Sequence, residues 1–427
     1  MRHARLPYGA GSTPGTWAIV PLKYLATLTN GYVFNSADRS DEGTPIIRIE
    51  NLNGSSNFNC STLSLPDKYR VEAGDLLFSW SGNPGTSFGP YLWTEPGQYY
   101  LNQHIFKVGV YGCDPRWLYW ALKAATHWIE RQLTSGMIGM VHVTKEDLAG
   151  VPIPVPPMEE QRRIAEFLDT ETARIDDLAR RQSNQSQLLA NRDVSDLSEV
   201  YQKLMREYGA IRLRHMLLRI EQGWSPQCDD RRVSGHEWGV IKAGCVNGGI
   251  FDPAQHKALP DQVSPRQEYA LREGDLLMSR ASGSTELIGS VGIVPELEYN
   301  LLLCDKVYRL SLDFRLGRVD FVAHMLRSHM VREHIKMGVS GGEGMANNLP
   351  TAVVKDCVLP KTPLSVQAST ARKLHGDFSR TARVRNALRR SIKLLSGRRQ
   401  ALITAAVTGQ FDVSTASGRN VTEGVSA

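Results

Sequence analysis

The chain has 427 residues, of which 41% are hydrophobic and 22% are charged, and its formal net charge is +6. This composition is typical of a globular protein and excludes a largely disordered chain. The sequence contains neither an apolar leader nor a run of about 20 apolar residues, so we expect a cytoplasmic protein without a membrane partner. The six cysteines are scattered without a C-x-x-C pair, and we therefore predict no bound metal.

The predicted elements occur twice, in the same order. The first copy consists of a strand with a turn, a Gly-Asp turn with a buried strand, a third strand and a helical run, at 46–54, 72–82, 104–108 and 119–136. The second copy has the same elements at 240–248, 273–283, 306–310 and 321–338. Both Gly-Asp turns lead into the same motif, "GDLL". A repeat of this length predicts two globular units of one topology.

Each copy ends in a proline-rich segment that leads into a long helix-forming run. "PVPPMEEQ" (154–161) and "PKTPLSVQ" (360–367) share two prolines and a glutamine at matching positions. Proline lacks the backbone donor that a strand or helix interior needs, and the following residues are strong helix formers. Apolar residues then recur at helical spacing, at Ile164, Leu168, Ile175 and Leu178 and again at Leu388, Ile392, Leu395 and Leu402. Each run predicts a helix of roughly 65–70 Å with an apolar stripe that must be buried.

The two predicted helices have complementary charges. Residues 364–412 contain ten Lys or Arg and two acids, whereas residues 158–205 contain ten acids and seven bases. We therefore expect an antiparallel pair of coiled-coil helices with a globular unit at each end. The predicted fold class is α+β, with a first globular domain at 1–157, a long helix at 158–208, a second globular domain at 209–363, a long helix at 364–412 and a disordered tail at 413–427.

Taken together, these motifs resemble the specificity subunit of type I restriction-modification enzymes. The resemblance rests mainly on "PPMEEQRRIAEFLDTETARIDDL" (156–178) and "GRRQALITAAVTGQFDV" (397–413). "IEQGWSPQ" (220–227) and "WGVIKAGCVNGG" (238–249) support it. It covers residues 21–413, but the first helix ends in a different sequence, so equivalent docking at both helix ends is not implied.

The resemblance implies a function. In that family the globular units are target recognition domains, each of which reads one half of a split, asymmetric DNA site. The helices set the spacing between the half-sites and carry two copies of the methyltransferase subunit. The implied partners are double-stranded DNA, two methyltransferase subunits and restriction or translocase subunits. The chain itself would be non-catalytic and bind no cofactor, whereas S-adenosylmethionine, ATP and Mg²⁺ would belong to the partner subunits.

Candidate DNA contacts lie where the predicted strands end in loops. Arg48 and Lys242 occupy matching strand ends, and Arg280 takes the place of Trp80, for which we expect core packing. Lys, Arg and Asn side chains supply phosphate and base contacts, so the candidate set is Arg48, Lys242, Arg280, Asn53, Asn247, Arg231 and Arg232. Gly-rich or basic loops near them lie at 81–89, 135–143, 223–232, 279–286 and 340–348. The simpler interpretation is a solvated side chain for each cation and a turn residue for each asparagine, because both asparagines precede glycine.

Candidate docking residues for a partner subunit lie on the two helical runs. They are Gln161, Arg162, Arg163, Arg389, Arg390, Arg398 and Arg399. The basic run at 383–399 could instead follow DNA phosphates, but its spacing along one helix face favours docking.

Two other function classes stay open at this stage. A coiled-coil adaptor that binds only proteins would show no salt-dependent DNA affinity. A self-contained methyltransferase would bind its cofactor alone, but the sequence lacks the paired-proline loop that holds a flipped adenine.

Overall fold

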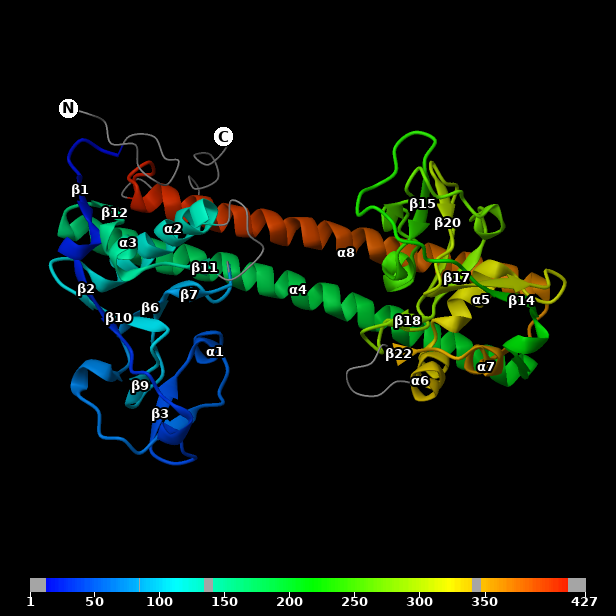
Figure 1. The fold of residues 1–427 in the computed structure, drawn as a ribbon, viewed down its shortest axis with the longest axis horizontal. Coiled ribbons are helices and arrows are strands. Elements are labelled where there is room, and N and C mark those ends of the chain that lie inside the picture. The colour runs from blue at the N-terminus through cyan, green and yellow to red at the C-terminus, as the bar shows by residue number, and fades with distance from the viewer. Residues whose placement is uncertain (1–12, 84, 134–140, 340–346, 414–427) are drawn as a thin grey trace. The chain divides into compact units, whose positions relative to one another are not determined.

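The structure, a computed structural model, describes residues 13–83, 85–133, 141–339 and 347–413 (Figure 1). The chain forms two compact units. Unit 1 contains residues 1–182 and 390–427, and unit 2 contains residues 183–389. The long helices α4 (Met158–Tyr208) and α8 (Leu364–Val407) each contribute one part to each unit. The unit boundary therefore falls inside both helices, because the two ends of each helix pack in different cores.

Unit 1 contains two four-stranded sheets. The first is antiparallel, with the order β2 (Ala26–Asn30), β10 (Ile105–Val110), β6 (Leu76–Ser79) and β8 (Gly89–Leu92). The second has the order β4 (Asn59–Ser61), β3 (Thr44–Ile47), β9 (Tyr99–Leu101) and β5 (Arg70–Val71), and its pair β3 and β9 is parallel. Short pairs join β1 (Ala18–Pro21) to β12 (Pro152–Val155) and β7 (Ser81–Gly82) to β11 (Val141–His142). The helices of this domain are α1 (Ile49–Leu52), α2 (Pro115–Leu133) and α3 (Lys145–Gly150), with 3₁₀ turns η1 (Leu22–Tyr24), η2 (Ser36–Asp38) and η3 (Asp67–Tyr69).

Unit 2 repeats this topology. Its antiparallel sheet has the order β14 (Leu217–Gln222), β21 (Val307–Leu312), β17 (Leu276–Ser279) and β19 (Val291–Ile293). The second sheet has the order β16 (His256–Ala258), β15 (Trp238–Ile241) and β20 (Asn300–Leu302), again with a parallel pair, β15 and β20. Short pairs join β13 (Ala210–Arg212) to β23 (Val358–Pro360) and β18 (Ala281–Ser282) to β22 (Asn347–Asn348). The helices are α5 (Val319–Leu326), α6 (His329–Gly338) and α7 (Thr351–Asp356), with 3₁₀ turns η4 (Leu213–His215), η5 (Ala243–Gly249) and η6 (Gln267–Tyr269). The predicted α+β class with two β-rich domains and two long helices is confirmed.

One predicted helix differs. The run at 321–338 was expected to form one helix, but α5 ends at Leu326 and α6 begins at His329. Ser328 between them has an extended backbone, and its hydroxyl donates a hydrogen bond to the Met325 carbonyl at 2.7 Å. This bond ties Ser328 to the end of α5 and not to α6, whereas the corresponding α2 of unit 1 continues unbroken.

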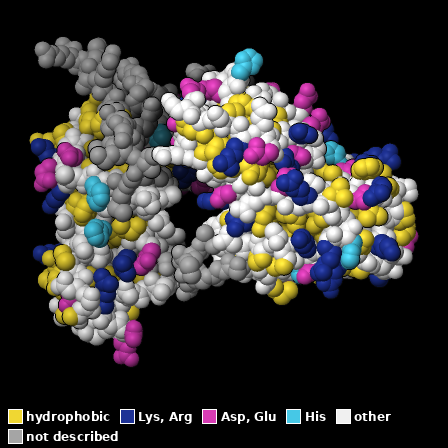
Figure 2. Space-filling view, turned by 45° about the vertical axis from the view of Figure 1, so that its right-hand side comes forward, with side chains coloured by type: hydrophobic (Ala, Val, Ile, Leu, Met, Phe, Trp, Pro, Cys, Tyr) yellow, Lys and Arg dark blue, Asp and Glu magenta, His cyan; other side chains and the backbone are white. Residues whose placement is uncertain are grey.

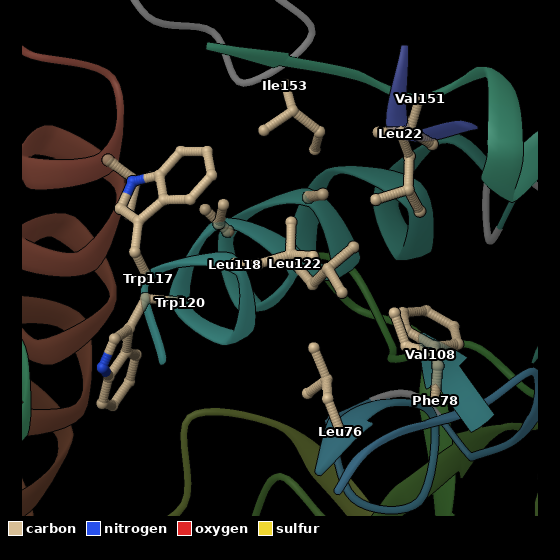
Figure 3. Close-up of a cluster of buried hydrophobic side chains, with 14 of the residues drawn as sticks. Leu22, Leu76, Phe78, Val108, Trp117, Leu118, Trp120, Leu122, Val151 and Ile153 are labelled. Carbon is tan, nitrogen blue, oxygen red and sulfur yellow. The ribbon is translucent and has the colours of Figure 1, made fainter. Parts of the chain in front are cut away.

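The main core of unit 1 lies between α2, the first sheet and the long helices. Figure 3 shows Leu118 and Leu122 of α2 on the side of Phe78 and Val108 of the sheet and Trp117 beside the long helix, and all five belong to one cluster of buried side chains. Burial of a side chain of this size contributes about 1.5–3 kcal/mol. Ile164 and Leu168 of α4 and Leu402 and Ile403 of α8 belong to the same cluster. The helices are thus part of the domain core.

The long helices run antiparallel in both units. In unit 1 the beginning of α4 meets the end of α8, where the Phe167 and Phe411 rings lie 5.5 Å apart. In unit 2 the end of α4 and the beginning of α8 share a core that includes Leu197, Tyr201, Leu204, Ala371 and Leu374. The predicted helix pair is confirmed.

The predicted seam of α4 is wrong at one residue. Ile164, Leu168 and Ile175 are buried, but Leu178 is 43% exposed. After Ile175 the inward-facing stripe continues four residues later, at the half-buried Ala179, because an α-helix has 3.6 residues per turn.

Candidate DNA-recognition surfaces

A buried glutamine joins each β-rich domain to a long helix. Gln161 of α4 accepts a hydrogen bond from the Asp114 backbone N–H at 2.8 Å, directly before α2, and donates one to the Pro156 carbonyl at 2.8 Å. Gln367 of α8 accepts from the Arg318 N–H at 2.8 Å, directly before α5. It donates to the Leu316 and Thr362 carbonyls, each at 2.9 Å. These bonds fix where α2 and α5 begin relative to the long helices.

This geometry changes the role of one predicted docking residue. The Gln161 side chain is 2% exposed, and both ends of its amide are hydrogen-bonded within the unit. It is therefore not available to a partner subunit. We assign it a positioning role and leave it out of the docking set.

In each unit, strand ends that are far apart in sequence meet at one place. The residue after β6 is Trp80, and its N–H donates to the His104 carbonyl at 3.3 Å. The matching residue after β17 is Arg280, and its N–H donates to the Lys306 carbonyl at 2.9 Å. Arg48 and Lys242 directly follow β3 and β15, which pair in parallel with β9 and β20. The turns that contain His104 and Lys306 directly follow those paired strands.

In unit 2 these positions surround a basic hollow. Its volume is about 500 Å³, and Lys242, Lys257 and Lys306 line it together with Gln227 and Asp305. The Arg280 guanidinium lies next to it, where it donates to the Asp305 carbonyl at 3.3 Å. Four cations from separate segments of the chain can thus reach one bound polyanion, and Gln227 adds a group that can contact a base edge.

Lys242 and Lys257 share a carboxylate at the rim of this hollow. Their Nζ atoms lie 3.1 and 3.4 Å from Oδ1 of Asp230. The hydrogen bond from Lys242 and then the two positive charges lower the pKa of Asp230. Lys242 is 39% exposed and Asp230 73% exposed, so water screens this pair and an incoming phosphate can replace the carboxylate.

The matching surface of unit 1 has different chemistry. Arg48 donates to Oδ1 of Asn59 at 2.8 Å and lies 3.3 Å from Glu50. The Trp80 ring lies 5.4 Å from the His104 ring, and its Nε1 donates to the Gln103 carbonyl at 2.9 Å. Trp80 is half-buried against the main core, close to the predicted core packing. This surface offers aromatic rings and imidazole where unit 2 offers lysine and arginine.

Two of the other candidate DNA contacts, Arg231 and Asn53, are engaged within the chain. Arg231 forms two 2.8 Å hydrogen bonds to the Glu237 carboxylate, which hold the pKa of that carboxyl at about 2. Asn53 ends α1, and its side chain donates to the Ile49 carbonyl at 3.2 Å, as a turn residue does. Asn247 and Arg232 are exposed. Of the loops, residues 134–140 and 340–346 lie outside the described residues.

Sequence reasoning missed two lysines of the hollow. Lys306 could have been found, because the repeat aligns it with His104 at the start of a strand. Lys257 carries no such signal, since β16 brings it beside β15 only in the folded chain.

Six arginines remain from the docking set. Arg162, Arg163, Arg389 and Arg390 are exposed on α4 and α8, and Arg398 is half-buried. Arg399 is engaged within unit 1, where its Nε lies 3.0 Å from Asp176 of α4 and its guanidinium lies 5.8 Å from the Trp120 ring. Figure 2 shows Lys and Arg side chains interspersed with acidic ones, not gathered in one block.

No metal or membrane site is apparent in the described ranges. They contain no group of three or more His, Cys, Asp or Glu side chains arranged to hold a metal ion. Among the helices that the structure describes, none has the length and apolar character needed to span a membrane.

Comparisons with known proteins agree with this geometry. Residues 14–186 match the model of the family described as Type I restriction modification DNA specificity domain. The specificity subunit of the type I restriction enzyme EcoBI of Escherichia coli is 22% identical over 94% of this chain and 88% of its own length. The EcoKI specificity subunit of Escherichia coli strain K12 is 22% identical over 94% of this chain and 90% of its own.

A solved structure has a similar fold. It comes from work on complex assembly and conformational transition of the type I R-M system. It aligns with a TM-score of 0.66 and 17% identity over 94% of this chain and 100% of that one.

In each unit a β-rich domain packs with one end of both long helices, and the match over residues 14–186 identifies a DNA-specificity protein. Residues 14–186 belong to the family of type I restriction modification DNA specificity domains. The chain is the DNA specificity subunit of a type I restriction-modification system. The interpretations as a DNA-independent adaptor or a self-contained methyltransferase are therefore set aside.

Proposed function

We propose that each unit recognises one half of a bipartite, asymmetric double-stranded DNA site through the surface that contains Arg48 in unit 1 and Lys242 in unit 2. The observation that supports this most is the common topology, which brings matching strand ends together in both units. The two surfaces differ in chemistry, because unit 1 has Trp80 and His104 where unit 2 has Arg280 and Lys306. Two different surfaces on one fold would recognise two different half-sites, and the whole site would be asymmetric.

We further propose that the long helices carry two copies of the methyltransferase subunit and that restriction subunits join this assembly. S-adenosylmethionine, ATP and Mg²⁺ would be bound by those subunits. The exposed arginines of α4 and α8 support this, because guanidinium groups form paired hydrogen bonds with carboxylates of a partner.

Co-expression with the methyltransferase subunit of the same operon tests the function. In a host without adenine methylation, N6-methyladenine mapped across the genome should form a split, asymmetric motif only when both proteins are present. Exchange of residues 1–157 for those of a relative should change one half of the motif. Co-purification of the two proteins without methylation would contradict the proposal.

The basic hollow of unit 2 gives a sharper prediction. The double substitution Lys242→Gln and Lys306→Gln should weaken binding to the identified duplex, and each lysine removed should lower the slope of log affinity against log salt by about 0.9, because each contributes one phosphate contact. Fluorescence anisotropy of the assembled complex at several salt concentrations measures this. Lys355→Gln, a charge loss on an exposed residue of α7, is the control and should leave the slope unchanged.

Charge reversal on α8 tests docking. Arg389→Glu with Arg390→Glu should abolish co-purification with the methyltransferase subunit, because the introduced glutamates would repel the carboxylates that the two arginines are proposed to bind. An assembled complex with lost DNA affinity would instead place these arginines on DNA.

A further inference from the structure

Unit 2 contains a second cavity, separate from the basic hollow and not explained by DNA recognition. Its volume is about 560 Å³, which falls within the range of small-molecule sites. It lies between the turn 248–251, strand β19, helix α5 and the long helices, all within unit 2. Phe251, Ile293 and Phe378 form apolar parts of its wall. Its polar lining includes His324, Arg327 and Arg385.

Three polar groups in this cavity lack a hydrogen-bond partner in the described part of the chain. Nδ1 of His324 and Nε of Arg385 are buried and unpaired, and the His324 residue as a whole is only 9% exposed. The Arg327 guanidinium lies 5.7 Å from the Phe378 ring and forms no hydrogen bond or ion pair with a described residue. Unpaired buried donors of this kind are costly, and an oxyanion would satisfy them.

The carboxylates near these cations do not balance them. The charge of Asp193 acts on both Arg327 and Arg385 without forming an ion pair with either among the described contacts, so two guanidinium groups face one carboxylate. Asp320 is held by Arg318 at 2.8 Å. One further negative charge can therefore be accommodated.

The turn at Gly249 approaches the Arg327 side chain closely. Gly249 has a φ of +79°, and a Cβ atom there would lie 2.6 Å from the Arg327 guanidinium carbon. Only glycine allows this close approach. Gly249 and the Arg327 guanidinium therefore lie in close contact at the cavity wall.

In unit 1 two aromatic side chains occupy the matching positions. Counting from the N–H groups that Gln161 and Gln367 bind, Trp120 corresponds to His324 and Tyr119 to Ala323. The Tyr119 and Trp120 rings pack 4.8 Å apart, and Nε1 of Trp120 donates to Asp169 at 2.8 Å.

The acids of unit 1 have no acidic counterparts in unit 2. Counting along the long helices from the two glutamines, Asp169 corresponds to His375 and Asp176 to Ala382. In unit 1 these two acids bind Trp120 and Arg399. Unit 2 therefore has an open space in place of two rings and unpaired donors in place of ion pairs.

We propose that this cavity binds a small organic phosphate, with the phosphate at Arg327 and Arg385 and the organic part against Phe251 and Phe378. A guanidinium fork matches phosphate oxygens, and the flanking rings suit an aromatic group. The site is separate from the proposed DNA contacts, and the proposal does not depend on them.

Calorimetric titration of the full-length chain tests this site with adenosine monophosphate and phenyl phosphate as probes. We expect both to bind, and adenosine to bind at least about tenfold more weakly because it lacks the oxyanion. Arg385→Gln should lower the affinity for both phosphates roughly ten- to hundredfold, which is the effect of losing a charged hydrogen bond. Ala323→Tyr with His324→Trp should abolish binding, since it restores the side chains that fill unit 1.

Three results would overturn the proposal. One is that neither adenosine monophosphate nor phenyl phosphate binds at millimolar concentration. Another is that Arg385→Gln and the filled variant bind the phosphates as tightly as the wild-type chain does. The third is that Arg385→Gln weakens only the binding of duplex DNA, which would identify a DNA phosphate as the occupant. Because Arg385→Gln leaves the packing of α5 intact, a folding failure of the filled variant would not hide the answer.

Discussion

Replacing Gln367 by leucine is expected to lower the free energy of unfolding of unit 2 by about 2–5 kcal/mol. The side chain is 1% exposed and forms three hydrogen bonds, to the Arg318 N–H and the Leu316 and Thr362 carbonyls. Leucine has a similar volume but no polar atoms, so these groups would lose their partner. Each buried group left unpaired costs about 1–3 kcal/mol. Because α5 begins at Val319, the loss should also loosen the first turn of that helix.

Denaturant unfolding and hydrogen exchange measure this effect. The Arg318 amide should exchange faster in the variant, together with the first turn of α5. Gln400→Leu is the matched control on the same helix, because its side chain makes a single long contact of 3.5 Å to Thr404. Equal stability losses in the two variants would show that the effect is not specific to the hydrogen bonds of Gln367.

The duplicated topology could be predicted from the sequence. Glycine and aspartate in "GDLL" identified β6 and β17, and the paired prolines with Gln161 and Gln367 located the start of both long helices within a few residues. Such signals are local, because they reflect turn geometry and hydrogen-bonding capacity over a few neighbouring residues.

The pairing of side chains could not be predicted in the same way. Arg399 was expected on a docking surface, yet its carboxylate partner Asp176 lies 223 positions away. Whether Arg231 faces solvent or Glu237 depends on how a loop folds back on itself. A repeat indicates which positions are equivalent, but not whether the equivalent side chains still do the same thing.

The cavity of unit 2 illustrates this limit. It arises because Ala323 and His324 replace two aromatic residues of unit 1. Each replacement is ordinary in the sequence, and the consequence appears only when α5, α8 and the turn at Gly249 are brought together.

The buried imidazole of His324 should make the stability of unit 2 depend on pH. Burial, followed by the charges of Arg327 and His375, lowers its pKa to about 4, whereas Asp320 acts in the opposite direction. In the unfolded chain a histidine has a pKa of about 6.5. Between these two values the unfolded state binds a proton that the folded state does not, so stability falls as pH falls. The full contribution is present above about pH 6.5, and about 3 kcal/mol is lost by pH 4.

Denaturant unfolding of the wild-type protein and His324→Phe between pH 7 and pH 4.5 tests this. Acid also protonates carboxylates, so the informative quantity is the difference between the two proteins. The variant should gain stability relative to the wild type as pH falls, by roughly 1.4 kcal/mol for each pH unit well inside this range. His329→Phe, at an exposed position of α6, controls for the loss of a histidine as such. Parallel pH curves for wild type and His324→Phe would mean that the imidazole takes up its proton as readily in the folded chain as in the unfolded one, and that the cavity around it is open to water.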